Sequence, residues 1–284
     1  MRVAVLTPRS VDELVATLSE YPQASLLAGG TDLMVEVNLH GRQPGKVISL
    51  RRVEELHEWS HRTTQQTVTI GAAVPYSFME TGQIAELLPA LAQAARTVGS
   101  PQIRAAGTLG GNLGTCSPAG DTLPVLAALN AVIHLLGPDG ARDVPWPDFM
   151  LGVKKNCLEI GEFVHSITLP VVPGWQGYAK VGSRNAMVIA TASTCLVRDT
   201  DEGLVTVALG SVGATIIRCT QSENWLAKTT SLRLGAQLDR TIAVEFGQRV
   251  ASESKPIDDH RSTAEYRKHC VAILAQRLLM RSFE

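Results

Sequence analysis

Two glycine pairs stand where an apolar run gives way to a helix-like segment, LLAGGTDL at 26–33 and GTLGGNLGTCSPAGD at 107–121. Glycine has no Cβ, so each pair lets a ligand or another backbone approach the main chain closely. The second pair lies in a stretch, 100–121, that is dense in Gly, Ser, Thr and Asn, which predicts a long loop. Long loops inside compact domains are usually functional, so the two segments together predict a ligand site.

The common nucleotide-binding motifs are missing from both segments. The first strand-like run is followed by TPRS, which lacks the G-x-G-x-x-G turn, and AGGTDL lacks the lysine of a phosphate-binding loop. Two glycine-rich segments before helices still predict an extended ligand such as a dinucleotide pyrophosphate, held from two sides by backbone N–H groups. The alternative stays open that both segments are surface turns, with Thr31, Asp32, Ser117 and Asp121 as helix caps.

The hydrophobic pattern predicts two different units that meet near residue 172. Strands alternate with helices before this point, whereas after it long strands at 177–199 and 203–219 are followed by helical regions at 224–254 and 262–282, which is typical of an α+β domain. A hairpin is expected at 131–146, with Pro-Asp-Gly at its turn. In the amino-terminal part we expect strands at 3–6, 24–30 and 46–50, another beginning at 67, and helices at 10–21, 31–41 and 83–99.

The composition of the 284 residues excludes several classes of function. Basic and acidic side chains number 26 and 27, the net charge is −1, and no sustained basic run appears, which argues against nucleic-acid binding. The first residues lack an apolar segment with a cleavage site, and nowhere do about 20 apolar residues follow one another. We therefore expect a cytoplasmic protein with no membrane span.

Reactive side chains are scattered along the chain. The five cysteines are widely separated, so their spacing fits neither a zinc nor an iron–sulfur ligand set. Neither glycine-rich segment contains a histidine, and no base stands near Cys116 or Ser117 in the sequence. We therefore expect no catalytic side chain and no bound metal, and a cofactor that carries any reaction.

Several motifs are similar to those of one known family. AGGTDL, IRAAGTLGGNLGTCSPAGDTLPVLAAL and GYAKVGSRNAMVIATAS resemble the FAD-binding medium subunit of molybdenum hydroxylases, a family that includes xanthine dehydrogenase and carbon monoxide dehydrogenase flavoproteins. The resemblance continues through VTVALGSVGATIIRC and DDHRSTAEYRKHCVAILAQRLL, so it covers nearly the whole chain. It implies an α+β protein with a vanillyl-alcohol-oxidase-like (PCMH-type) FAD-binding domain at 1–172, made of two α/β subdomains (about 1–55 and 56–172). A carboxy-terminal α+β domain at 173–284 would follow, with an antiparallel sheet covered by helices on one face.

The resemblance also implies which residues hold FAD. One side of the FAD pyrophosphate would lie on the first glycine segment and the other side on the second. Asp121 would hold polar groups of this pyrophosphate bridge. Leu158 would pack near the cofactor, where ordinary core packing is the alternative, and Lys180 would lie near the isoalloxazine ring, where a solvated lysine is the alternative. The implied residues are Leu27, Ala28, Gly29, Gly30, Thr31, Asp32, Leu33, Thr108, Gly111, Asn112, Thr115, Ser117, Asp121, Leu158 and Lys180.

Two positions depart from the family pattern. Ala105 stands where the family often has asparagine, a departure that concerns a local side-chain hydrogen bond. Val98 stands where eukaryotic xanthine dehydrogenases have phenylalanine near the flavin, a departure that concerns ring stacking and the electron acceptor; the sequence leaves the effect of both open. No residue matches a covalent flavin link.

The resemblance implies an oxidoreductase subunit that works inside a larger complex. Noncovalent FAD would take electrons from [2Fe–2S] clusters of a small partner subunit and pass them to NAD⁺, oxygen or a quinone. A large partner subunit would carry molybdopterin, in a dimer of heterotrimers. The alternatives are a stand-alone FAD-dependent oxidoreductase of the same fold and a noncatalytic assembly subunit.

Overall fold

A small parallel sheet begins the chain in this computed structural model, which describes residues 4–284. The central strand is β3, with β1 and β2 parallel to it on either side. Helix α1 crosses between β1 and β2, and its Leu14 and Leu18 are completely buried in a core that includes Ile48 of β3. Residue 3 of the expected first strand lies outside the described residues. The elements are β1 Ala4–Leu6, α1 Val11–Glu20, β2 Ser25–Leu27, α2 Leu33–Leu39, β3 Lys46–Ser49 and two 3₁₀ turns, Leu50–Arg52 and Glu54–His57.

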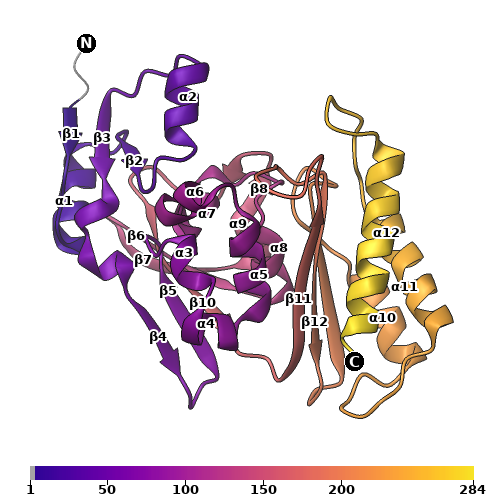
Figure 1. Ribbon diagram of the computed structural model, residues 1–284. Coiled ribbons are helices and arrows are strands. Elements are labelled where there is room, and N and C mark those ends of the chain that lie inside the picture. Colours follow the sequence, from indigo (N-terminus) through magenta and orange to yellow (C-terminus); the bar gives the residue numbers. More distant parts are fainter. Residues whose placement is uncertain (1–3) are drawn as a thin grey trace.

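The second unit is a five-stranded antiparallel sheet in the order β4-β5-β10-β6-β7 with helices on one face (Figure 1). Strand β4 was not expected, because its sequence WSHR carries a weak apolar signal. The single helix expected at 83–99 is in fact two helices, because Pro89 begins a new one. The elements are β4 Trp59–Arg62, β5 Thr67–Gly71, α3 Tyr76–Met79, α4 Gly82–Leu87, α5 Pro89–Thr97, α6 Pro101–Ala106, α7 Leu109–Thr115, α8 Leu123–Ala128, β6 Val132–Gly137, β7 Gly140–Pro145, α9 Trp146–Phe149, β8 Met150–Gly152, β9 Lys155–Asn156 and β10 Phe163–Pro170.

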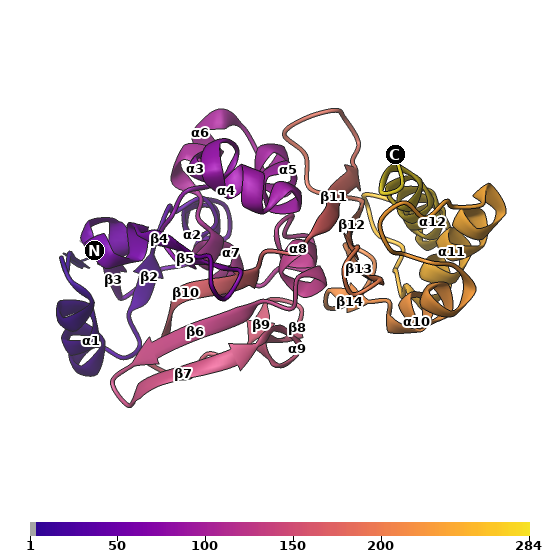
Figure 2. The same cartoon turned by 90° about the horizontal axis from the view of Figure 1, so that it is seen from below.

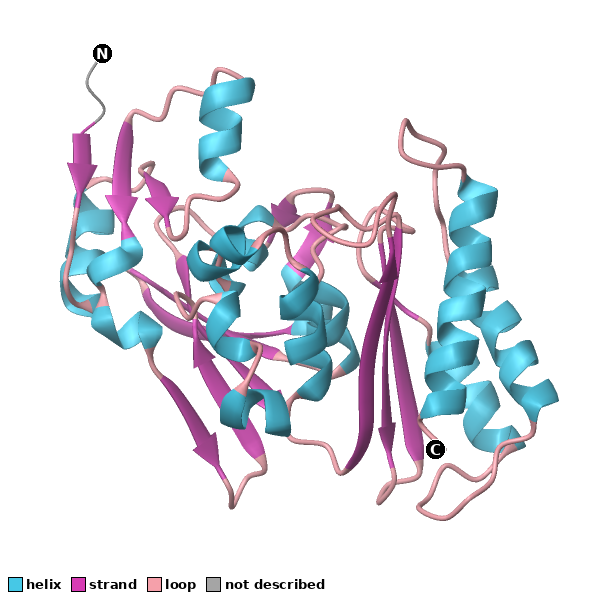
Figure 3. Ribbon diagram, in the orientation of Figure 1, coloured by secondary structure: helices cyan, strands magenta, loops and turns pink. Residues whose placement is uncertain are grey.

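The third unit is a four-stranded antiparallel sheet in the order β11-β12-β13-β14. Strand β12 is buried on both faces, because α10 to α12 cover one face and α5 and α8 of the second unit cover the other (Figures 1 and 3). A ten-residue loop, 182–191, interrupts the strand expected at 177–199, and three helices replace the two expected helical regions. The elements are β11 Gly174–Val181, β12 Ala192–Asp199, β13 Leu204–Gly210, β14 Ile217–Arg218, α10 Thr220–Thr229, α11 Arg240–Glu253 and α12 Ala264–Arg281.

One hydrophobic core joins the second and third units. Cys195 and Ala208 of the four-stranded sheet belong to the same buried cluster as Leu91 of α5 and Leu126 of α8. Seen from below, α8 lies between the two sheets, and α10 to α12 form the far end of the molecule (Figure 2). The α+β fold expected from the resemblance is confirmed. Within residues 4–284, every helix is too short or too polar to cross a bilayer.

Candidate functional site

The first glycine segment, 28–32, links β2 to α2 and packs against the protein's own backbone. A Cβ at Gly29 would lie 1.8 Å from the carbonyl oxygen of Ala106, the last residue of α6. Gly30 has a φ of +72°, a left-handed conformation that glycine adopts without strain. The close approach of Gly29 therefore fixes the first segment beside the start of α7.

Asp32 joins the two glycine-rich segments. It occupies the N-cap position of α2, but its carboxylate makes no capping hydrogen bond, so the alternative that it caps the helix is wrong. Its Oδ2 instead accepts a hydrogen bond from Thr115 Oγ1 at 3.2 Å. The two segments are 83 residues apart in sequence, and this contact shows that they meet, as the two-sided site requires.

Most of the stretch 100–121 is not the long loop that its composition predicted, and only residues 117–121 lie outside the helices and their caps. Helices α6 and α7 fill most of residues 100–115, and each begins at a hydroxyl cap: Ser100 Oγ accepts from Ile103 N, and Thr108 Oγ1 accepts from Gly111 N. These caps satisfy N–H groups at the helix starts and so offset the low helix propensity of the glycines.

The glycines of α7 have different surroundings. A Cβ at Gly110 would lie 2.6 Å from the carbonyl oxygen of Ala72, so this glycine lets α7 pack directly on the β5–α3 connection. At Gly114 a Cβ would meet no atom within 4 Å, and at Gly111 it would meet Thr108 Oγ1 at 3.0 Å and Ala28 Cβ at 3.9 Å. Gly111 and Gly114 thus leave a bare backbone surface beside the first segment.

The polar side chains of the second segment mostly bond within the protein. Asn112 Oδ1 accepts from Thr122 Oγ1 at 2.7 Å, and Ser117 Oγ accepts from the backbone N–H of Ala119 at 3.3 Å. Asn112 and Ser117 therefore shape the segment, as Thr108 and Thr115 do. The surface left for a ligand is provided chiefly by backbone.

Asp121 does not cap α8, because Thr122 occupies that position and makes no side-chain cap. Its carboxylate is 9% exposed and contacts the third unit: Oδ2 lies 2.8 Å from Lys180 Nζ, and Oδ1 accepts from Tyr178 Oη at 2.8 Å. Burial raises the pKa of Asp121, while Lys180 and Tyr178 oppose that rise. Tyr178 was not among the expected site residues, although its i, i+2 spacing from Lys180 on β11 places both on one face of the strand.

Lys180 is buried, so the alternative of a solvated lysine is wrong. Its Nζ donates to Asp121 Oδ2, to the Thr97 carbonyl oxygen at 2.9 Å and to the Val188 carbonyl oxygen at 3.1 Å. All three ammonium protons therefore have acceptors. Lys180 joins the end of α5, the start of α8 and the loop 182–191.

The remaining expected residues lie around these contacts. Leu158, after β9, is partly buried against the main core, and its N–H donates to Asn156 Oδ1 at 3.2 Å. Val98 ends α5 and is also partly buried against that core. Ala105 is exposed on α6, where the preceding Arg104 forms an ion pair with Glu80 at 2.5 Å.

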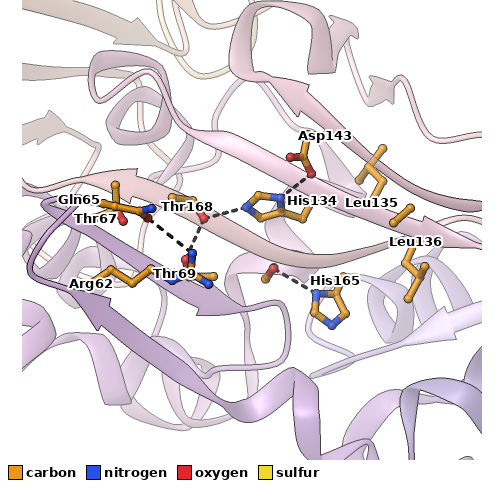
Figure 4. Close-up of a pocket in the computed structure, with 12 residues that line it drawn as sticks. Arg62, Gln65, Thr67, Thr69, His134, Leu135, Leu136, Asp143, His165 and Thr168 are labelled. Atoms are coloured by element: carbon orange, nitrogen blue, oxygen red, sulfur yellow. Dashed lines mark hydrogen bonds and ion pairs between the residues drawn. The ribbon is translucent and has the colours of Figure 1, made fainter.

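A hollow of about 530 Å³ lies on the outer face of the five-stranded sheet, away from the glycine-rich segments (Figure 4). On its floor, Asp143 Oδ1 lies 2.6 Å from His134 Nδ1, His134 Nε2 lies 2.7 Å from Thr168 Oγ1, and Thr168 lies 2.8 Å from Thr69 Oγ1. This order resembles an acid, base and nucleophile. However, Thr168 is on the central strand β10, whose backbone pairs on both sides, so no free N–H pair is available there as an oxyanion hole. We assign the chain of hydrogen bonds to cross-strand stabilisation of the sheet.

The part of the chain that the structure describes contains no group of three or more metal-ligating side chains. Four of its five free cysteines are buried, and burial raises the pKa of Cys116 to about 11. Such a thiol is protonated at neutral pH and unreactive.

Comparison with known proteins identifies the family. Residues 1–172 match the FAD-binding domain in molybdopterin dehydrogenase, and residues 178–282 match the CO dehydrogenase flavoprotein C-terminal domain. The chain belongs to this FAD-binding family of molybdopterin dehydrogenases. It is an oxidoreductase of the molybdenum hydroxylase class, of the FAD-binding medium-subunit type, as the resemblance predicted.

Individual relatives are similar over almost their full length. The carbon monoxide dehydrogenase medium chain of Hydrogenophaga pseudoflava is 31% identical over 282 residues, which cover 96% of this chain and 94% of the relative. The glyceraldehyde dehydrogenase medium chain of Sulfolobus acidocaldarius is 29% identical, with 94% of each chain covered. A solved carbon monoxide dehydrogenase from Hydrogenophaga pseudoflava superimposes with a TM-score of 0.87 at 29% identity, over 98% of this chain and 96% of that one.

Proposed function

We propose that this chain is the electron-transfer flavoprotein of a heterotrimeric molybdenum hydroxylase. A small partner subunit with [2Fe–2S] clusters would deliver electrons, and a large subunit with molybdopterin would oxidise the substrate, in a dimer of heterotrimers. FAD, when bound, accepts electrons singly and releases them in pairs, to NAD⁺, oxygen or a quinone. This chain would bind the cofactor and position it, with residues 1–172 as the FAD-binding domain and 173–284 as the carboxy-terminal α+β domain.

The bare backbone of Gly111 and Gly114 beside the first glycine segment carries this proposal. A pyrophosphate must approach the main chain closely, and the missing side chains at Gly111 and Gly114 leave room for that approach. In the proposed site, residues 27–33 and the residues Thr108, Gly111, Asn112, Thr115 and Ser117 hold the pyrophosphate from two sides. Asp121 would hold polar groups of the pyrophosphate bridge, and its partner Lys180 would lie, with Leu158, near the flavin ring.

The first prediction concerns the purified chain. We expect a yellow protein that contains about one FAD per chain, released intact by acid precipitation because the bond is noncovalent. Absorbance of the supernatant and chromatography of the released flavin measure this. A colourless protein that fails to bind added FAD, yet still binds its partner subunits, would instead support a noncatalytic assembly subunit.

The second prediction concerns Gly111. Replacing it with valine should weaken FAD binding at least about tenfold, because the side chain would occupy the bare surface of α7 and press on Thr108 Oγ1, 3.0 Å from the new Cβ. Fluorescence titration of the apoprotein with FAD measures the dissociation constant. Gly45→Val is the matched control, since Gly45 has no atom within 4 Å of a built Cβ. Equal dissociation constants in the two variants would contradict the role of the α7 surface.

A further inference from the structure

Tyr178 and Lys180, both in the carboxy-terminal domain, donate hydrogen bonds to the carboxylate of Asp121. Each oxygen of Asp121 has one partner, the Tyr178 hydroxyl at 2.8 Å on Oδ1 and the Lys180 ammonium at 2.8 Å on Oδ2. All three residues are at most 9% exposed. With both oxygens engaged, the carboxylate is held in one orientation.

The position of Tyr178 itself is fixed by neighbouring elements. Its backbone N–H donates to Gln93 Oε1 of α5 at 2.8 Å, on the edge of β11 that faces the FAD-binding domain. Its other edge pairs with β12, where Tyr178 stands opposite Cys195. The hydroxyl therefore approaches Asp121 from a strand that is anchored on both sides.

The net charge of the cluster of Tyr178, Asp121 and Lys180 depends on Asp121. Lys180 supplies one positive charge, and its other two hydrogen bonds go to the neutral carbonyl groups of Thr97 and Val188. Asp121 is thus the only anion that the cation contacts within hydrogen-bonding distance in residues 4–284. The Tyr178 hydroxyl takes up part of the carboxylate charge, so it adjusts the balance between Asp121 and Lys180.

We propose that Tyr178 is a positioning residue that tunes the flavin of this subunit through Asp121 and Lys180. This inference rests on the proposed function, in which Lys180 lies near the flavin ring. Without the hydroxyl, the carboxylate charge is less shared and offsets more of the lysine charge. The reduced flavin, which is the more negative form, is then bound less tightly relative to the oxidised form.

The test is Tyr178→Phe in the full-length flavoprotein. We expect the reduced flavin to lose about tenfold in affinity relative to the oxidised form, which lowers the two-electron midpoint potential by about 30 mV. Spectroelectrochemical titration of the bound FAD measures it. Tyr21→Phe is the matched control, because the Tyr21 ring packs under Lys46 in the first unit, away from this cluster. A melting temperature lowered without any shift in potential would reduce Tyr178 to a structural role and overturn the proposal.

A second variant keeps the proposal testable if Tyr178→Phe does not fold. Asp121→Asn keeps an acceptor for the tyrosine hydroxyl but removes the negative charge, so we expect the potential to rise. A potential that is unchanged or lower would overturn the proposal. A wild-type chain that binds no FAD would reject the proposed function itself, whereas FAD-loaded variants with wild-type potentials would reject this inference alone.

Discussion

Replacing Gly29 with alanine is expected to destabilise the protein by about 3 kcal/mol or more and to remove its bound FAD. The new Cβ would lie 1.8 Å from the carbonyl oxygen of Ala106 and 2.4 Å from its carbonyl carbon. Backbone atoms cannot rotate away as a side-chain end can, so the first glycine segment and the α6–α7 junction must move apart. That movement would separate the two segments that form the proposed FAD site.

Urea unfolding and the FAD content of the purified variant measure the two effects. Gly45→Ala is the matched control, because the same methyl group meets no atom there. The two glycine substitutions in the site should also differ from each other. Gly29→Ala should lower both stability and FAD content, whereas Gly111→Val should lower FAD affinity with less change in stability. If Gly29→Ala unfolds at the same urea concentration as the control, the close packing of these segments is wrong.

Glycine content predicted that something approaches the backbone, but it could not predict what. At Gly29 and Gly110 the approaching group is the protein's own backbone, at Ala106 and Ala72. At Gly114 the space is open. The sequence has glycine at all three positions. Whether a glycine contacts backbone or open space depends on segments far apart in the chain.

The hairpin and the approximate positions of most strands could be predicted because their signals are local, although the strands expected at 177–199 and 203–219 are each divided in two. The β-branched and aromatic residues of β11 to β13 and the Pro-Asp-Gly turn between β6 and β7 are signals that need no distant partner. Helices α6 and α7 were missed because glycine and serine content outweighed two available signals. Ser100 before Pro101, and Thr108 three residues before Gly111, are helix-start patterns that the structure uses as caps.

The Asp121 cluster shows where sequence reasoning ends. Asp121 and Lys180 were each expected near FAD, but their ion pair joins positions 59 residues apart and could not be inferred from one sequence. Tyr178 lies in the GYAKVGSRNAMVIATAS motif, two residues before Lys180, but that position did not predict its contact with Asp121. The packing of β11 on α5 brings these residues together, so the cluster follows from tertiary structure alone.

Replacing Lys180 with methionine is expected to lower the free energy of unfolding by about 3 to 5 kcal/mol at neutral pH, the typical effect of leaving one buried charge unpaired. Asp121 would keep the hydrogen bond of Tyr178 but lose its cation, and the carbonyl oxygens of Thr97 and Val188 would lose a donor. Urea unfolding measures the loss in the free energy of unfolding. Lys155→Met on the exposed end of β9 is the matched control, and it should change stability by less than about 0.5 kcal/mol.

The loss of unfolding free energy in Lys180→Met should be larger at high pH than at low pH. Burial already raises the pKa of Asp121, and removing Lys180 takes away the strongest opposing interaction, so the pKa of Asp121 rises further in the variant. A carboxyl group whose pKa is higher in the folded than in the unfolded state favours folding when protonated. That contribution is fully present below the unfolded pKa and is lost as the pH rises through the folded pKa. We therefore expect Lys180→Met to lose less stability at pH 5 than at pH 8.

A double variant tests whether Asp121 is the group left unpaired. Adding Asp121→Asn to Lys180→Met should recover part of the stability at pH 8 and abolish the pH dependence. An equal loss of stability at both pH values in Lys180→Met would show that the Asp121 carboxylate is not the group left unpaired.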